Sequence, residues 1–162
     1  MEIREVQEED WPQIWALMEP IIRAGETYCW DRELDEESAR KIWLEPRPAY
    51  VYVAHEDGRV LGTAQLHPNR EGGGSHVANA SFMTAAAATG RGVASALAAH
   101  VLKQAPAQGY RSMQFNAVVE TNVRAVALWQ SLGFRILATV PESFRHPAHG
   151  FTGLHIMHKD LA

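Results

Sequence analysis

A glycine-rich turn in the middle of the chain has the residue types needed to bind a phosphate group. It contains Gly90-Arg91-Gly92, follows a strand-like segment that ends at Met83, and leads into a run of good helix formers from Val93. Glycine lets the backbone approach a ligand closely. The first turn of a helix presents unpaired N–H groups at the positive end of its dipole. Strand, glycine turn and helix start together predict an anion cradle suited to a pyrophosphate.

Two familiar nucleotide-binding motifs do not account for this turn. No Gly-Lys-Ser or Gly-Lys-Thr follows at the spacing of a Walker A loop. The preceding strand belongs to an expected antiparallel meander, so the strand–helix–strand unit of the Rossmann fingerprint is missing. A plain strand-to-helix turn stays open as an alternative, because ordinary tight turns also use glycine.

The elements that position this turn follow from apolar spacing and turn residues. Residues 2–6 are strand-like, and an amphipathic helix is predicted next from the helical spacing of Trp11, Ile14, Trp15, Met18, Ile21 and Ile22. Asp35 is suited to cap a second, shorter helix. Glu56-Asp57-Gly58 predicts a hairpin turn between strands at 50–54 and 59–66. A third strand of this meander is expected over His76–Met83.

The second half of the chain alternates helices and strands. The helix after Gly92 is followed by a strand over Ser112–Val119, and a helix that starts at Asn122 ends at Gly133. The last strands are predicted at 134–140 and 153–158. The order strand–helix–helix–three strands–helix–strand–helix–two strands predicts an α/β (α+β) fold. We expect a mixed central sheet of about seven strands, antiparallel in its first half, with helices on both faces.

Composition limits the class of protein. A chain of 162 residues predicts one domain over 1–162, and the net charge of −4 argues against a nucleic-acid partner. Cys29 is the single cysteine, which fits a reducing compartment. No apolar run reaches membrane-spanning length and the N-terminus lacks a secretory pattern. These features predict a cytoplasmic protein with no membrane partner.

Two motifs resemble those of the GCN5-related N-acetyltransferase (GNAT) superfamily. Thr89-Gly-Arg-Gly-Val-Ala94 is similar to the family's Gln/Arg-x-x-Gly-x-Gly/Ala motif, although Thr89 stands in place of the leading Gln/Arg. The stretch from Asn122 to Phe134 is similar to Asn-x-x-Ala-x-x-Leu-Tyr-x-x-x-Gly-Phe, with Trp129 in place of the tyrosine. The resemblance covers essentially the whole chain and implies acetyl-CoA as co-substrate.

The resemblance also implies which residues bind acetyl-CoA. Backbone amides of the glycine turn hold the pyrophosphate in this family, and the residue matching Asn122 contacts the pantetheine arm. The tyrosine that Trp129 replaces protonates the leaving thiolate, and an indole cannot do this. The expected cofactor-binding residues are Phe82, Met83, Thr84, Thr89, Gly90, Arg91, Gly92, Val93, Ala94, Ser95, Asn116, Asn122 and Trp129.

A narrower resemblance points to acetyltransferases of small amino acids and analogues, of the phosphinothricin, methionine-sulfoximine and proline-analogue types. Asn79, Asn116 and Asn122 fit the asparagine pattern of the proline-analogue type. It implies that Asn79 lies at the reaction centre, where its carboxamide could bind the substrate amine or a developing oxyanion. The expected chemistry is direct attack of an amine on the thioester, whose carbonyl would be bound by a backbone N–H near Met83.

The acceptor pocket is expected from the loop between the first two helices and from a late loop at Ser143–Gly150. Tyr28, Trp30, Arg145 and His149 are its candidate residues, with Arg145 suited to a substrate carboxylate. The amine must lose a proton to a base or to water, and the candidate bases are Glu26, Glu120, His76 and His149. Cys29 is a further candidate nucleophile. The histidine spacings do not match a zinc site, so no metal is expected.

Several functions stay open at this level. The favoured one is acetyl transfer to the amine of a small-molecule amino acid or analogue. The alternatives are acetylation of protein N-termini, polyamines or antibiotics, and a non-catalytic acyl-CoA-binding module. By analogy with the family, a homodimer is expected.

Overall fold

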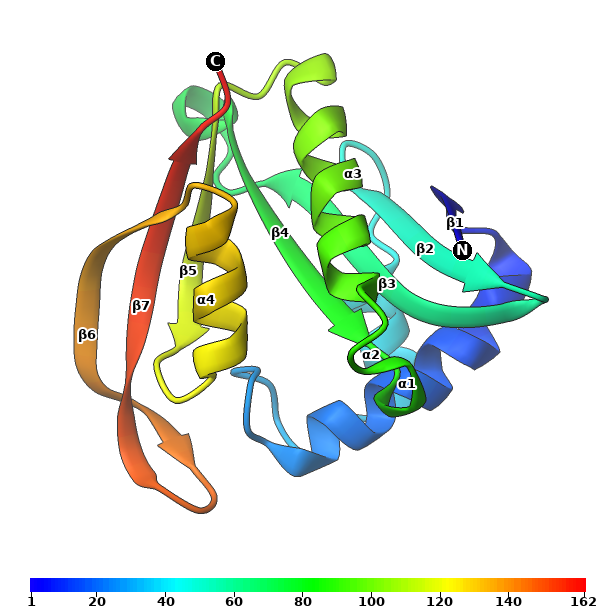
Figure 1. Ribbon diagram of the computed structural model, residues 1–162, viewed down its shortest axis with the longest axis horizontal. Coiled ribbons are helices and arrows are strands. Elements are labelled where there is room, and N and C mark those ends of the chain that lie inside the picture. Colours follow the sequence, from blue (N-terminus) through cyan, green and yellow to red (C-terminus); the bar gives the residue numbers. More distant parts are fainter.

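A mixed seven-stranded sheet forms the centre of the fold, in the order β1-β2-β3-β4-β5-β7-β6 (Figure 1). This computed structural model describes all residues, 1–162. The strands are β1 Glu2–Glu5, β2 Tyr50–Glu56, β3 Arg59–Pro68, β4 Val77–Thr84, β5 Ser112–Val119, β6 Arg135–His146 and β7 Gly150–Asp160. The helices are α1 Trp11–Ala24, α2 Glu36–Trp43, α3 Val93–Ala107 and α4 Val123–Ser131. This architecture confirms the fold predicted from the sequence.

Neighbouring strands pair antiparallel everywhere except between β4 and β5, which are parallel. The β2–β3 hairpin turns at Asp57 and Gly58, whose φ angles are +50° and +75°. Positive φ at both central residues is the geometry of the tight hairpin turn predicted there. The meander β1–β4 is therefore antiparallel, as expected, and the sheet becomes mixed at β5.

The two faces of the sheet are covered by different helices (Figure 1). On one face α1 and α2 bury Ile14, Met18 and Trp43. On the other face α3 and α4 bury a second cluster that includes Leu97 and Trp129. The helical spacing of apolar residues in α1 explains this packing, because residues three and four apart share one helix face. One pair of helices thus forms a layer on each face of the sheet.

The start of α2 confirms the predicted cap. The Asp35 carboxylate accepts a hydrogen bond from the Ser38 backbone N–H at 2.9 Å. This bond satisfies one of the amide groups that a helix leaves unpaired in its first turn.

The last two strands are longer than predicted. The segment expected as a late loop, Ser143–Gly150, is mostly strand, and Phe144 pairs with Thr152 across β6 and β7. Pro141 and the charged residues around it mask the strand pattern in the sequence. Such residues are tolerated because β6 is the edge of the sheet, where proline need not donate a ladder hydrogen bond. Only the hairpin tip remains as a turn.

Strands β4 and β5 separate soon after they meet (Figure 1). Their pairing comprises Val77 with Ser112 and Ala78 with Met113, and no later residue of β4 pairs with β5. The other edge of β5 pairs with β7 from Ser112 to Val119. The outer edge of β4 therefore loses its strand partner from about its third residue on, which opens a cleft inside the sheet.

An ion pair fixes the entry to α1. The Arg4 guanidinium donates two hydrogen bonds to the buried Asp10 carboxylate, at 2.7 and 2.9 Å. The same carboxylate accepts the Gln7 backbone N–H at 2.7 Å. The Arg4 hydrogen bonds lower the pKa of Asp10.

We predict that Asp10→Asn lowers the free energy of unfolding by about 1–3 kcal/mol, because hydrogen bonds to a charged group are lost. A lowered pKa stabilises the fold above the unfolded pKa of about 4, and this contribution disappears as the pH falls through the folded value. Urea denaturation at neutral and acidic pH measures the difference in free energy of unfolding between the wild type and Asp10→Asn. This difference should become smaller in acid. Glu33→Gln, an exposed carboxylate, is the control. Equal stability of Asp10→Asn and the wild type at pH 7 would contradict the assignment.

Candidate functional site

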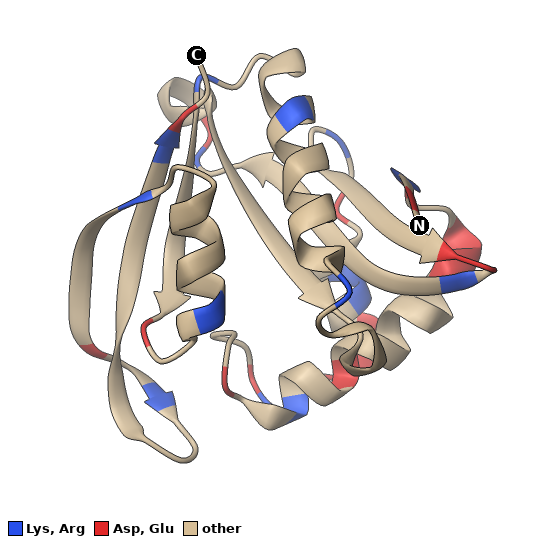
Figure 2. Cartoon of the chain, in the orientation of Figure 1, with Lys and Arg blue, Asp and Glu red and all other residues tan.

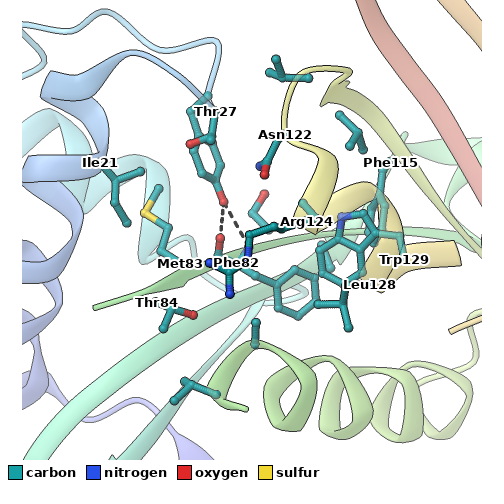
Figure 3. Close-up of a pocket in the computed structure, with 18 of the residues that line it drawn as sticks. Ile21, Thr27, Phe82, Met83, Thr84, Phe115, Asn122, Arg124, Leu128 and Trp129 are labelled. Carbon is teal, nitrogen blue, oxygen red and sulfur yellow. Dashed lines mark hydrogen bonds between the residues drawn. The ribbon is translucent and has the colours of Figure 1, made fainter. Parts of the chain in front are cut away.

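The cleft between β4 and β5 widens into a pocket of about 760 Å³ (Figure 3). Its walls come from the α1–α2 loop, β4, the turn before α3, the start of α3, β5 and α4. Among the residues predicted for the site, those lining it are Tyr28, Trp30, Asn79, Phe82, Met83, Thr84, Thr89, Gly90, Gly92, Val93, Ala94, Ser95, Asn116, Asn122 and Trp129. Segments far apart in the sequence thus meet at one site.

The turn before α3 supplies a row of free backbone amides. The N–H groups of Gly90, Gly92, Val93, Ala94 and Ser95 make no hydrogen bond within the protein, and all five residues line the pocket. In contrast, the neighbouring N–H groups at 89 and 91 are bonded within the turn. Free amides at the start of a helix are suited to bind an anion. The predicted cradle therefore has the donors that a pyrophosphate requires.

The two glycines of the cradle are needed for its backbone shape. Gly90 and Gly92 have φ angles of +81° and +76°, which residues with a side chain rarely adopt. A Cβ atom added at either position would meet no protein atom within 4 Å, because it would project into open space at the turn. That space is available to a ligand, so the cradle fits a pyrophosphate.

The backbone of β4 presents only alternate residues to the cleft. Ala85 N–H donates to Leu61 O, and Asn69 N–H donates to Val77 O. Because antiparallel pairs alternate between bonded and non-bonded positions, these two bonds direct the amides of Ser81 and Met83 toward β3. The prediction of Met83 itself as a catalytic residue is therefore corrected, because its amide faces β3 and not the cleft. The amides that face the cleft belong to its neighbours, Phe82 and Thr84.

Tyr28 from the α1–α2 loop contacts this exposed backbone directly. Its hydroxyl donates to Phe82 O at 2.6 Å and accepts from Phe82 N–H at 3.2 Å, the two dashed lines in Figure 3. Burial among the pocket walls raises the pKa of Tyr28 well above its usual range. The phenol therefore stays neutral at every pH near neutrality.

Asn79 lies in the cleft, and half of its carboxamide is already engaged. Its Oδ1 accepts the Ala80 N–H at 2.8 Å. This amide is the first on β4 to lose its partner where β5 separates, so the side chain substitutes for the missing strand. The Nδ2 group makes no hydrogen bond within the protein and is free to donate to a ligand.

Asn116 is connected to a loop outside the cleft. Its Nδ2 donates to Asn69 Oδ1 at 2.7 Å, and its Oδ1 accepts from Gln114 Nε2 at 3.1 Å. These bonds fix the orientation of the Asn116 carboxamide and tie the loop after β3 to β5. Asn116 therefore contributes a rigid polar wall to the pocket.

Asn122, just before α4, and Trp129 on α4 lie at the other side of the cleft (Figure 3). Asn122 occupies the N-cap position, but its side chain makes no capping hydrogen bond. Trp129 is 8% exposed, and its ring lies 4.9 Å from both Phe82 and Phe115. Trp129 thus packs in an aromatic cluster while one edge of it borders the pocket.

Some residues predicted for the site lie elsewhere. Arg145 and His149 belong to the β6–β7 hairpin and do not line the cleft, because β6 and β7 extend through the expected loop. Arg145 lies over the Phe151 ring, and His149 lies beside His146. The Arg91 side chain turns outward to an ion pair with Glu56, which also binds the N-terminal ammonium group at 2.9 Å.

The candidate bases are absent from the pocket wall, since Glu26, His76 and Glu120 do not line it. Glu120 instead accepts the Gly153 N–H at 2.6 Å on β7. Cys29 does line the pocket, but burial raises the pKa of its thiol, which disfavours the nucleophilic thiolate.

One charged residue of the pocket escaped sequence reasoning. Arg124 in the first turn of α4 is the only lining residue with a formal charge at neutral pH. Figure 2 shows this basic turn of α4 as a blue segment on an otherwise uncharged helix. The sequence did offer one sign of this role: Arg124 lies two residues after Asn122, at the start of a predicted helix.

Two further features of the chain bear on its class. No group of three or more His, Cys, Asp or Glu side chains is arranged to hold a metal ion. None of the four helices combines the length and apolar character that crossing a membrane requires.

The fold and the cleft together define a class of protein. The parted parallel strands leave an amide cradle at one end of the cleft and polar groups of β4 at the other, an arrangement suited to an extended, phosphate-bearing ligand. The model of the acetyltransferase (GNAT) family matches residues 3–134. The chain belongs to this family and is an N-acetyltransferase.

Comparisons with individual proteins agree with the family and the fold. A GCN5-related N-acetyltransferase from Kribbella flavida is 52% identical, with a TM-score of 0.95 over 98% of this chain and 96% of that one. A phosphinothricin acetyltransferase from Sinorhizobium meliloti, solved in complex with acetyl-CoA, is 18% identical with a TM-score of 0.87 over 99% and 88%. N-acetyltransferase aca1 from Schizosaccharomyces pombe is 31% identical over 90 residues, which are 56% of this chain and 43% of the yeast protein.

We predict that Gly92→Ala weakens acetyl-CoA binding at least about tenfold, because a methyl group and a strained φ disturb the amide cradle. Gly109→Ala is a matched control: its φ is +92°, the added Cβ also meets open space, and it does not line the pocket. Both variants should lose similar thermal stability, and calorimetric titration should show weaker binding only for Gly92→Ala. Unchanged acetyl-CoA affinity of Gly92→Ala would show that the pyrophosphate does not bind at this turn.

Proposed function

We propose that the chain transfers acetyl from acetyl-CoA to the amine of a small amino acid or amino-acid analogue, by direct attack of the amine on the thioester. Acetyl-CoA is the co-substrate. The amides at Gly90, Gly92 and the start of α3 hold its pyrophosphate, and Arg124 adds positive charge to the pocket. The Asn122 side chain, free of any capping bond, is available to the pantetheine arm. When bound, acetyl-CoA supplies the activated acetyl group.

The observation that carries the choice of acceptor is the character of the lining. No aspartate, glutamate, lysine or histidine lines the pocket. A polyamine needs carboxylates to pair with its second ammonium group, so this lining disfavours such acceptors. The lining residues Tyr28 and Trp30, whose rings lie 5.2 Å apart, and the carboxamides of Asn79 and Asn116 match a small, partly apolar molecule.

Asn79 is suited to recognise the carboxylate of such an acceptor. Its Oδ1 is occupied by the Ala80 N–H, so only the Nδ2 donor remains for a ligand. A donor binds an oxygen atom and cannot accept a hydrogen from an amine. We therefore assign Asn79 Nδ2 to a carboxylate oxygen of the acceptor, which turns the amine toward the thioester.

The test is thiol release from acetyl-CoA across a panel of amines. We expect turnover with a small amino acid, and much weaker turnover with its methyl ester, with polyamines and with aminoglycosides. The panel includes a peptide with N-terminal alanine, because a ribosomal-protein-alanine N-acetyltransferase from Brucella melitensis is 26% identical, with a TM-score of 0.87. Turnover of that peptide alone would replace the acceptor assignment, and binding of acetyl-CoA without any turnover would favour a non-catalytic module.

Asn79→Asp sharpens this test, because aspartate keeps the acceptor for Ala80 N–H and replaces the donor with a negative charge. We expect kcat/KM for the amino acid to fall about 10²-fold, since like charges in contact cost several kcal/mol. For the methyl ester, which lacks the carboxylate charge, kcat/KM should fall much less. Acetyl-CoA affinity should stay within about threefold, a free-energy difference under about 0.7 kcal/mol. Equal losses for both acceptors would contradict the assignment.

The pH dependence should follow the acceptor and not the enzyme. No base lines the pocket, and the raised pKa values of Tyr28 and Cys29 keep both groups protonated near neutrality. The amine must therefore be deprotonated before it attacks, so kcat/KM rises with pH and levels off above the pKa of the amine. Two acceptors whose amines differ by about two pKa units should give midpoints that differ equally. A midpoint that is the same for both would reveal an enzyme base.

A further inference from the structure

The hydrogen bonds of the Tyr28 hydroxyl are not the only contacts that hold the α1–α2 loop. The α1–α2 loop is anchored elsewhere: Arg23 donates to Arg32 O at 2.5 Å, and Arg32 Nε donates to Arg23 O at 2.8 Å. Trp30 packs edge-on against the buried Trp43, with 6.2 Å between ring centroids. In addition, the Tyr28 hydroxyl forms hydrogen bonds with the backbone N–H and C=O of Phe82, which both face the cleft.

Two hydrogen-bond donors therefore lie together where β4 faces the cleft. Without a ligand both donors are engaged: Phe82 N–H donates to the Tyr28 oxygen at 3.2 Å, and the hydroxyl, which can rotate about its C–O bond, donates to Phe82 O at 2.6 Å. An oxyanion site needs donors that are about 2.7–3.1 Å from the developing negative charge. A single ligand oxygen that enters beside both groups can replace these two bonds and accept from both donors.

No other phenol can serve this cleft. The chain has four tyrosines, and Tyr28 is the only one that lines the pocket. Trp129 borders the same cleft from α4, and its indole N–H is a donor without an acidic proton near neutrality.

We propose that the Tyr28 hydroxyl and the Phe82 backbone N–H together bind the carbonyl oxygen of the acetyl thioester. Tyr28 is then a catalytic residue of the transfer. This inference rests on the proposed function, because it needs an acetyl thioester in the cleft. It adds a side-chain donor to the backbone amide of β4.

The step balances without any gain or loss of a proton at Tyr28. The amine lone pair forms the C–N bond while the carbonyl electrons move onto oxygen, where both donors stabilise the charge. Return of those electrons breaks the C–S bond and releases the thiolate. The nitrogen gives one proton to water and the thiolate takes one from water, so the products are an amide and a thiol. Phe82 O, freed when the hydroxyl rotates, accepts an N–H of the attacking amine. The buried phenol keeps its proton because its pKa is raised.

The test compares Tyr28→Phe with the wild type, and Tyr50→Phe is the control. Tyr50 lies on β2, does not line this pocket and makes no side-chain hydrogen bond through its hydroxyl. We expect kcat of Tyr28→Phe to fall about 10²-fold, as for the loss of one oxyanion donor. Its acetyl-CoA affinity should change less than about threefold, under about 0.7 kcal/mol. Tyr50→Phe should match the wild type in both.

An infrared measurement distinguishes a donor from a structural support. The carbonyl stretch of acetyl-CoA labelled with ¹³C at the carbonyl should lie at lower frequency when bound to the wild type than in water. It should move back toward the water value in Tyr28→Phe. An unshifted band in the wild type overturns the proposal even if the variant does not fold. A carbonyl band shifted equally in the wild type and in Tyr28→Phe also overturns the proposal.

The two levels of proposal fail in different ways. A wild-type protein that binds no acetyl-CoA and turns over no amine refutes the proposed function, and the role of Tyr28 with it. A wild type that turns over an amine, with Tyr28→Phe equally active, refutes the role of Tyr28 alone.

Discussion

The separation of β4 from β5 is the constraint on which the rest of the structure depends. Inside a sheet each backbone N–H and C=O is normally paired, so parted strands leave polar groups that need other partners. Asn79 accepts the first free amide, at Ala80, and Tyr28 bonds both groups of Phe82. Side chains thus stabilise an opening that would otherwise be costly, and they do so at the positions where a ligand must bind.

This opening also explains how two substrates can meet. The sheet separates the molecule into two layers, each with its own hydrophobic core. A gap within the sheet joins these layers: the amide cradle and α4 lie on one side, and the aromatic side chains of the α1–α2 loop lie on the other. A donor held along α3 and α4 can therefore present its acyl group to an acceptor that enters from the opposite face.

The sequence predicted those features that depend on neighbours along the chain. The cradle at Gly90 and Gly92 and the cap at Asp35 are encoded locally, and the structure has both. Met83 shows the limit, because the direction of its amide depends on pairing with β3 and not on its own surroundings. Arg145 shows another, because proline and charge beside it concealed a long edge strand. The contact of Tyr28 with Phe82 joins residues 54 positions apart, and no local pattern announces it.

The aromatic walls of the cleft have a practical consequence for spectroscopy. Trp30 and Trp129 border the same pocket from opposite sides, one beside the α1–α2 loop and the other in the cluster under α4. Their emission depends on the polarity around each indole. The chain has three further tryptophans, so each signal is obtained as the difference in emission between the wild type and a variant that lacks Trp30 or Trp129. Those two differences give an optical reporter for each half of the cleft.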